Sequence, residues 1–107
     1  SAAVRCQQTI WPTAHQFGIQ IELSNSLSEG STSQTSDLLE KLAQGEISDA
    51  SPILCSHGDV ISELIRSLTL KGMRTPKRKG FAKASVWELS FSNGTIESGL
   101  YHDSHFR

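Results

Sequence analysis

The first stretch with a clear hydrophobic pattern is residues 3–17, where apolar side chains recur at three- and four-residue intervals. This spacing predicts an amphipathic helix with one buried face. Gly18 follows at the position where a glycine commonly ends a helix. Pro12 lies inside the stretch and lacks a backbone N–H, so we expect a kink or a break there.

Two further stretches show the same period. Residues 37–44, "DLLEKLAQ", are preceded by Ser36, a good N-cap, and followed by Gly45. Residues 59–70, "DVISELIRSLTL", place their apolar side chains on one face and end before Gly72. Both stretches are predicted helices.

The strand signals are of three kinds. Residues 19–23, "IQIEL", alternate and are β-branched, which predicts a short strand. Residues 52–56, "PILCS", are almost continuously apolar, which is typical of a strand covered on both faces in a parallel sheet. Residues 85–91 and 95–101 flank the Asn-Gly pair at 93–94, the strongest short signal for a β-hairpin.

Together these elements predict an α/β fold, with a mainly parallel sheet flanked by helices and a C-terminal antiparallel hairpin. The 107 residues suit a single domain spanning 1–107, and 36% hydrophobic with 20% charged residues is typical of soluble globular proteins. No apolar run approaches the roughly 18 residues of a membrane span, so we expect no membrane partner. The polar residues 24–36 predict a loop long enough to suggest a function.

Charge changes this picture at one place. The net charge is −1, yet residues 71–83 hold six of the ten cations and no acid. The remaining four cations and eleven acids leave the rest of the chain at −7. A basic segment on an acidic body predicts local attraction for an anion, although many such runs are simply solvated loops.

The two cysteines, Cys6 and Cys55, are too few for a disulfide framework. We therefore expect free thiols and a reducing, cytoplasmic location. Such thiols usually behave as small buried or half-buried side chains.

His57 is the main candidate for chemistry. It follows the predicted strand 52–56 and precedes a predicted helix. In open α/β sheets ligands bind beyond the carboxyl ends of strands, and the N–H groups of a helix N-terminus attract anions. Gly58 allows a ligand close to the backbone, and a histidine can donate to a phosphate oxygen. The alternative is a histidine that only bonds a nearby carbonyl.

Four short motifs point to a family. "RCQQT" (5–9), "LSEG" (27–30), "ILCSHGDVI" (53–61) and the "SVWELSF–NG" hairpin (85–94) occur in the order found in the histidine phosphatase superfamily, the phosphoglycerate-mutase-like enzymes. The chain most resembles the small bacterial phosphohistidine-phosphatase-like branch, which includes domains fused to Nudix hydrolases. The resemblance runs from residue 1 to about residue 101. It implies phosphoryl transfer through a phosphohistidine, with no cofactor and no metal.

The resemblance also implies roles for individual residues. Arg5 matches the arginine that grips the phosphate, a task that suits a guanidinium because its fork meets two oxygens. Glu29 matches the acid that protonates the leaving oxygen and later activates water. His57 matches a histidine that stabilises charge on the transferring phosphoryl group, with the N–H of Gly58 beside it. The alternatives are a solvated Arg5 and a solvated loop carboxylate at Glu29.

One departure is decisive for catalysis. The Arg-His-Gly triplet that carries the family's nucleophile is absent, since none of the histidines at 15, 57, 102 and 105 has these neighbours. We expect the chain to be the C-terminal part of a histidine-phosphatase-like domain, or else a homologue that has lost catalysis. Turnover is then not expected, although phosphate binding can survive. Unpaired strand edges would favour a homodimer or pairing with the missing segment.

The second hypothesis is a non-catalytic phosphate- or nucleotide-binding module that uses residues 71–83. Phe81 is the only aromatic residue in this segment, which argues against nucleic acid. His102 and His105 have no third ligand nearby, so we expect a polar C-terminus and no metal there.

For the phosphoryl-transfer hypothesis, the substrate would be a phosphorylated small molecule or a phosphoprotein. Four aromatic residues are predicted to pack in the core or on the sheet: Trp11, Trp87, Phe91 and Tyr101.

Overall fold

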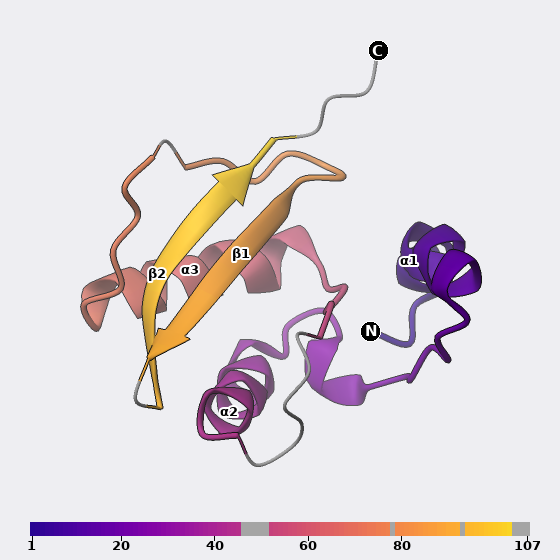
Figure 1. Cartoon of the computed structure of the whole chain (residues 1–107), viewed down its shortest axis with the longest axis horizontal. Coiled ribbons are helices and arrows are strands. Elements are labelled where there is room, and N and C mark those ends of the chain that lie inside the picture. The colour runs from indigo at the N-terminus through magenta and orange to yellow at the C-terminus, as the bar shows by residue number, and fades with distance from the viewer. Residues whose placement is uncertain (46–51, 78, 93, 104–107) are drawn as a thin grey trace.

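The computed structural model of the chain describes residues 1–45, 52–77, 79–92 and 94–103. Within these residues it contains three α-helices, a short 3₁₀ helix and an antiparallel hairpin (Figure 1). In chain order the elements are α1 (Val4–Phe17), η1 (Asn25–Leu27), α2 (Thr32–Ala43), α3 (Gly58–Leu70), β1 (Val86–Ser92) and β2 (Thr95–His102). The fold is therefore a mixed α/β arrangement, and the predicted fold class is confirmed to that extent. No helix in the described part of the chain is long and apolar enough to cross a membrane.

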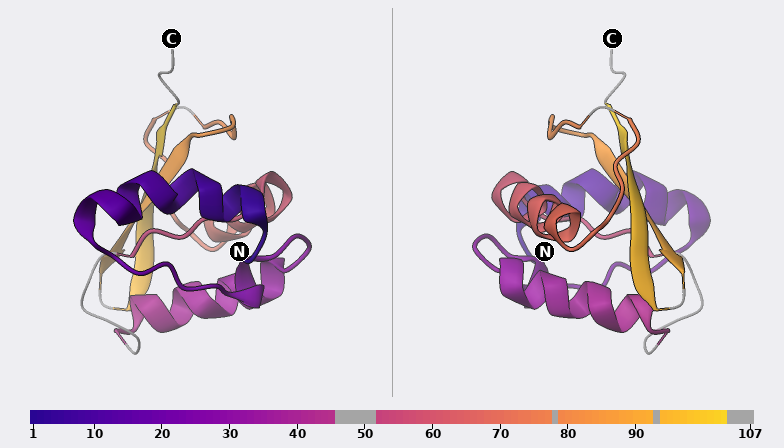
Figure 2. Two further views of the ribbon diagram at one scale, coloured as in Figure 1. Left: turned by 90° about the vertical axis from the view of Figure 1, so that its right-hand side faces the viewer. Right: turned by 90° about the vertical axis from the view of Figure 1, so that its left-hand side faces the viewer.

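The hydrophobic core lies between α2, α3 and the hairpin. Leu39 and Leu42 of α2 meet Leu64 of α3, and all three are buried. Four partly buried apolar side chains complete this core: Leu38, Leu68, Leu89 and Ile96. By contrast, α1 lies at the side of the molecule opposite to the hairpin (Figures 1 and 2).

The helix predicted over residues 3–17 is confirmed as α1. Gly18 ends it in the left-handed conformation, with φ 64°, and Ile19 N–H donates to the Ala14 carbonyl at 2.8 Å. Of the kink or break predicted at Pro12, the break is wrong, because α1 continues through this residue. Both Pro12 and Gln8 are exposed, so water can reach the Gln8 carbonyl that Pro12 cannot pair.

The second helix begins earlier than predicted. It starts at Thr32, so Ser36 lies inside α2 and is not its N-cap, and part of the predicted loop 24–36 is helical. Thr35 is the reason, since its side chain is buried and its hydroxyl donates to the carbonyls of Ser26 and Ser31. These bonds attach the start of the helix to η1. The third helix is confirmed as α3, one residue longer than predicted.

The two predicted strands at 19–23 and 52–56 are not strands in the structure. A strand needs a hydrogen-bonded neighbour, and the described residues supply none beside either segment. The predicted mainly parallel sheet is consequently not present among the described residues, where the only sheet is the hairpin. The alternating pattern at 19–23 indicated a tendency to extend and could not specify a pairing partner.

The hairpin itself is confirmed. Trp87 pairs with Tyr101 and Val86 with His102, and the register shifts between Ser90 and Phe91. Gly94 takes a positive φ of 75° in the turn, while Asn93 lies outside the described residues.

The aromatic side chains divide into two pairs. Tyr101 is buried and Trp87 is half-buried, as predicted. Trp11 and Phe91 are 55% and 41% exposed, so the predicted packing is wrong for these two. Trp11 belongs to a helix that buries only Cys6, which leaves its ring without a covering layer.

Candidate functional site

His57 caps the N-terminus of α3. Its backbone is extended, with φ −112° and ψ 155°, and the Ile61 N–H donates to its carbonyl at 2.9 Å to start the helix. The side chain is only 8% exposed. Gly58 is the first residue of α3, and its N–H lies at the positive end of the helix dipole. The predicted position of His57, just before a helix, is confirmed, although the segment in front of it is not a strand.

Arg5 and Glu29 converge on the His57 ring from separate parts of the chain. Arg5 is 52 residues before His57 and 24 before Glu29. Its Nη2 lies 3.1 Å from His57 Nδ1 and donates to Glu29 Oε1. The same Glu29 oxygen is 3.5 Å from Nδ1. A cation, a carboxylate and an imidazole thus share one point at the N-terminal ends of α1 and α3.

The contacts define which nitrogen of the neutral His57 ring carries hydrogen. A guanidinium can only donate, so a bond from Arg5 requires Nδ1 to accept. The ring hydrogen is then on Nε2, which lies 2.9 Å from Ser1 Oγ and donates to it. If Arg5 moved away, a hydrogen on Nδ1 could instead bond Glu29. Arg5 and Glu29 therefore compete for the same ring nitrogen.

Two side chains hold the loop that carries Glu29 against the start of α3. Gly30 N–H donates to Asp59 Oδ2 at 3.2 Å, and Ser56 Oγ donates to the Leu27 carbonyl at 2.7 Å. Sequence reasoning missed both Ser56 and Asp59 as positioning residues. Asp59 could have been noticed as an acid in the first turn of α3, where it favours the helix dipole. Nothing in the sequence connected it to Gly30.

The buried side of the His57 ring faces Ser1 and the Cys6 thiol. Cys6 Sγ lies 3.9 Å from His57 Nε2 and 3.8 Å from the Ser56 carbonyl. The Ser1 amino group donates to the Cys55 carbonyl at 2.8 Å. Burial, followed by the neighbouring Cys6 thiol, raises the pKa of Cys55 to about 11. Cys55 is therefore an uncharged thiol at neutral pH, and the charged side chains beside the His57 ring are those of Arg5 and Glu29.

The open side of the cluster faces water. The side chains of Arg5 and Glu29 are 65% and 64% exposed. An anion arriving from solvent can reach the guanidinium directly, while His57 stays fixed behind it.

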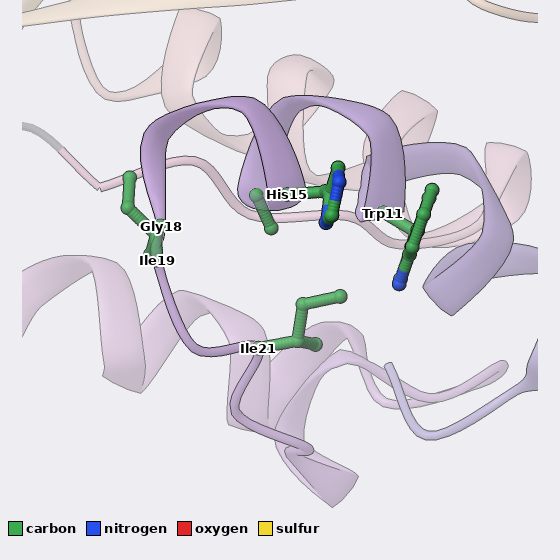
Figure 3. Close-up of a pocket in the computed structure, with 6 residues that line it drawn as sticks. Trp11, His15, Gly18, Ile19 and Ile21 are labelled. Atoms are coloured by element: carbon green, nitrogen blue, oxygen red, sulfur yellow. The ribbon is translucent and has the colours of Figure 1, made fainter.

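A hollow of about 300 Å³ lies elsewhere, between the second half of α1 and the chain that follows it (Figure 3). Its lining includes Trp11 and His15, whose rings stack with centroids 4.7 Å apart and planes 10° from parallel. Ile21 faces these two rings, and Ile19 lies beside Gly18 at the end of the hollow. It contains none of Arg5, Glu29 and His57, so it is separate from the histidine site.

The remaining candidates have other surroundings. His102 Nε2 lies 2.9 Å from Glu88 Oε1 across the hairpin, while His105 is outside the described residues. In the described part of the chain, no group of three or more His, Cys, Asp or Glu side chains could hold a metal ion. The cations of segment 71–83 that the structure describes are all exposed, and Arg78 lies outside its described residues.

No protein-family model matches this chain, and no curated protein matches it. The resemblance to the histidine phosphatase superfamily accordingly stays a prediction from the four motifs.

Proposed function

We propose that this chain forms the phosphate-binding part of a phosphoryl-transfer domain of the histidine phosphatase type. Arg5 and His57, with the N–H of Gly58, would bind the phosphoryl group, and Glu29 would act as general acid and base. The observation that carries the proposal is the 3.1 Å approach of Arg5 Nη2 to His57 Nδ1. If a phosphate takes the place of the bond between them, with a hydrogen now on Nδ1, these two nitrogens can donate to different oxygens of that phosphate.

The position of Glu29 supports its proposed role. Its carboxylate already touches the two groups that would hold the phosphate. A phosphate bound to Arg5 would take the place of this carboxylate and leave Glu29 beside the ester oxygen, where a proton donor is needed. The bonds from Asp59 and Ser56 restrict the loop and so limit how far Glu29 can move.

The nucleophile would come from a segment with the Arg-His-Gly triplet, which the sequence does not contain. We therefore propose binding without turnover for this chain by itself. In the complete protein a histidine would attack phosphorus and form the phosphohistidine that water later hydrolyses. Suitable substrates are a phosphorylated small molecule or a phosphoprotein, in a reducing cytoplasm that keeps both cysteines as thiols.

Uncovered apolar side chains support the proposed pairing with that segment or with a second copy. Ile19 and Leu23 are 61% and 59% exposed, and Ile53 is 69% exposed. An added strand beside either extended segment would bond its backbone and cover these side chains. Sedimentation velocity measures whether the chain alone is a dimer. Self-pairing through this surface predicts a dimer for the native chain and a monomer for Ile19→Lys.

The test of the site is calorimetric titration with inorganic phosphate and with vanadate. Arg5→Ala should weaken binding about 10- to 100-fold, since hydrogen bonds to charged groups contribute about 1.5–3 kcal/mol. Arg66→Ala is the matched control, because Arg66 is an exposed arginine in the middle of α3. His57→Ala should weaken binding too. Unchanged affinity in both the Arg5 and His57 variants, with folding verified by circular dichroism, would reject the site.

A further inference from the structure

A second surface is built by the loop that leads into the hairpin. Phe81 stacks on Trp87 of β1, with ring centroids 5.9 Å apart and planes 28° from parallel. Trp87 in turn contacts the Tyr101 ring of β2 at 5.5 Å. We call these three rings the aromatic cluster. Phe81 is its outermost member and is 45% exposed, so part of its ring faces solvent.

The loop is fixed on the cluster by its backbone. Trp87 Nε1 donates to the Gly80 carbonyl at 3.0 Å, and Ala82 N–H donates to the Tyr101 hydroxyl at 3.3 Å. A Cβ at position 80 would lie 2.6 Å from Tyr101 Cζ, so only glycine allows this approach. Phe81 stands between these two anchored residues. Its ring is therefore held in place before any ligand arrives.

Cations precede and follow Phe81 along the chain. Lys79 and Lys83 lie two residues before and after Phe81, and both are exposed. Lys71, Arg74 and Lys77 of the same segment are exposed as well. No ion pair joins any of these five to another residue that the structure describes. Their charge is available to an anion, in a segment without acids on a chain whose remainder carries −7.

We infer that the aromatic cluster and the exposed cations of residues 71–77 and 79–83 form a binding surface for single-stranded nucleic acid. One unpaired base stacks on the open face of Phe81, and the lysines contact the phosphates on either side. A duplex offers no free base face, and a mononucleotide would engage few of the cations that are spread over thirteen residues. The sequence argued against this ligand because the segment contains one aromatic residue. The hairpin supplies the two rings that support it.

The inference does not depend on the proposed phosphatase site, because it uses none of Arg5, Glu29 and His57. It is tested by fluorescence anisotropy of a labelled oligothymidylate of about 12 nucleotides, within the range that such surfaces cover. Phe81→Ala should weaken binding about 5- to 100-fold, and Phe81→Trp should retain it. Phe17→Ala is the matched control, since Phe17 is an exposed phenylalanine on α1. It should leave the affinity unchanged.

The salt dependence tests the charges. Lys79→Ala and Lys83→Ala should each reduce the slope of log affinity against log salt by about 0.7, while Lys41→Ala on α2 should not. Circular dichroism and melting curves verify that the variants fold. Two results would overturn the inference: Phe81→Ala binds the oligonucleotide as tightly as the native chain does, or the native chain binds inorganic polyphosphate as tightly as the oligonucleotide. Either result would show that binding depends on charge and not on base stacking. If thymidine monophosphate bound as tightly as the oligonucleotide, the ligand would be a free nucleotide, and the inference of a single strand would be rejected.

Discussion

The two sides of the molecule differ in how their apolar surface is covered. On one side α2, α3 and the hairpin share a core of leucines, and α3 buries Val60, Leu64 and Ile65. On the other side α1 buries only Cys6. Seven large apolar side chains are exposed on α1 and on the extended segments near it: Val4, Trp11, Phe17, Ile19, Leu23, Ile53 and Leu54.

The contrast shows that polar contacts attach α1 to the rest. Arg5, Ser1 and Cys6 reach the His57 region, and these contacts form the candidate site. Exposed ion pairs contribute only about 0–1 kcal/mol, so they cannot replace a hydrophobic interface. The candidate site thus lies where a well-packed half meets a half whose apolar surface lacks a cover among the described residues.

The largest effect on the free energy of unfolding is expected when one large apolar side chain is truncated in each half and the two variants are compared. Leu64→Ala removes a buried side chain from the core and should lower the free energy of unfolding by about 2–5 kcal/mol. Trp11→Ala should change it by less than about 0.5 kcal/mol, because that ring is 55% exposed. Urea titration followed by circular dichroism measures both. A large loss for Trp11→Ala would mean that α1 is covered in solution.

The junction between the halves should protect Cys55 from alkylation. With its pKa raised from 9.0 to about 11, its thiolate fraction at pH 8 should be about 100-fold lower than in the unfolded chain. Iodoacetamide labelling with and without urea, read by mass spectrometry of the Cys55 peptide, measures the ratio.

The same shift gives a pH dependence. The folded state favours the neutral thiol, so its stabilisation is present below pH 9 and is lost as the pH rises from 9 through 11. Cys55→Ser should show a smaller loss of stability over that interval.

Equal iodoacetamide labelling of Cys55 in the folded and unfolded chains would contradict its predicted burial.

On the packed side, Gly80→Ala should lower the free energy of unfolding by about 1–3 kcal/mol. The added methyl would meet the Tyr101 ring at 2.6 Å, and the loop must move to relieve the contact. Gly58→Ala is a useful control, since a Cβ there has no neighbour within 4 Å. If the two variants were equally stable, loop 80–82 would not be packed on the aromatic cluster.

The smallest effect is expected at Glu29. Glu29→Gln removes the carboxylate that bonds Arg5, so phosphate should bind about two- to fivefold more tightly, consistent with an exposed ion pair. Glu22→Gln changes another exposed carboxylate, seven residues before Glu29, and should leave the affinity unchanged. Weaker binding by Glu29→Gln would show that the carboxylate supports the bound anion instead of competing with it.

The candidate site could be predicted only in part. The resemblance singled out Arg5, Glu29 and His57, and the structure brings all three together. Nothing in the sequence connected Ser56 and Asp59 to the Glu29 loop that they hold, because their partners lie 29 residues away in the sequence. Hydrogen bonds of this kind depend on where two loops meet, which no local pattern records.

The sequence by itself determined the features that depend on near neighbours. The hydrophobic period of residues 3–17 and 59–70 predicted α1 and α3, and Gly18 predicted the end of the first helix. The Asn-Gly pair predicted the hairpin. Each of these signals reflects conformational preferences within a few residues. The tertiary structure decided what depends on distant partners. The bond from Thr35 to Ser26 moved the start of α2, and segment 19–23 has no neighbouring strand among the residues that the structure describes. Backbone preference is local, whereas strand pairing and side-chain convergence require a partner that only the folded chain supplies.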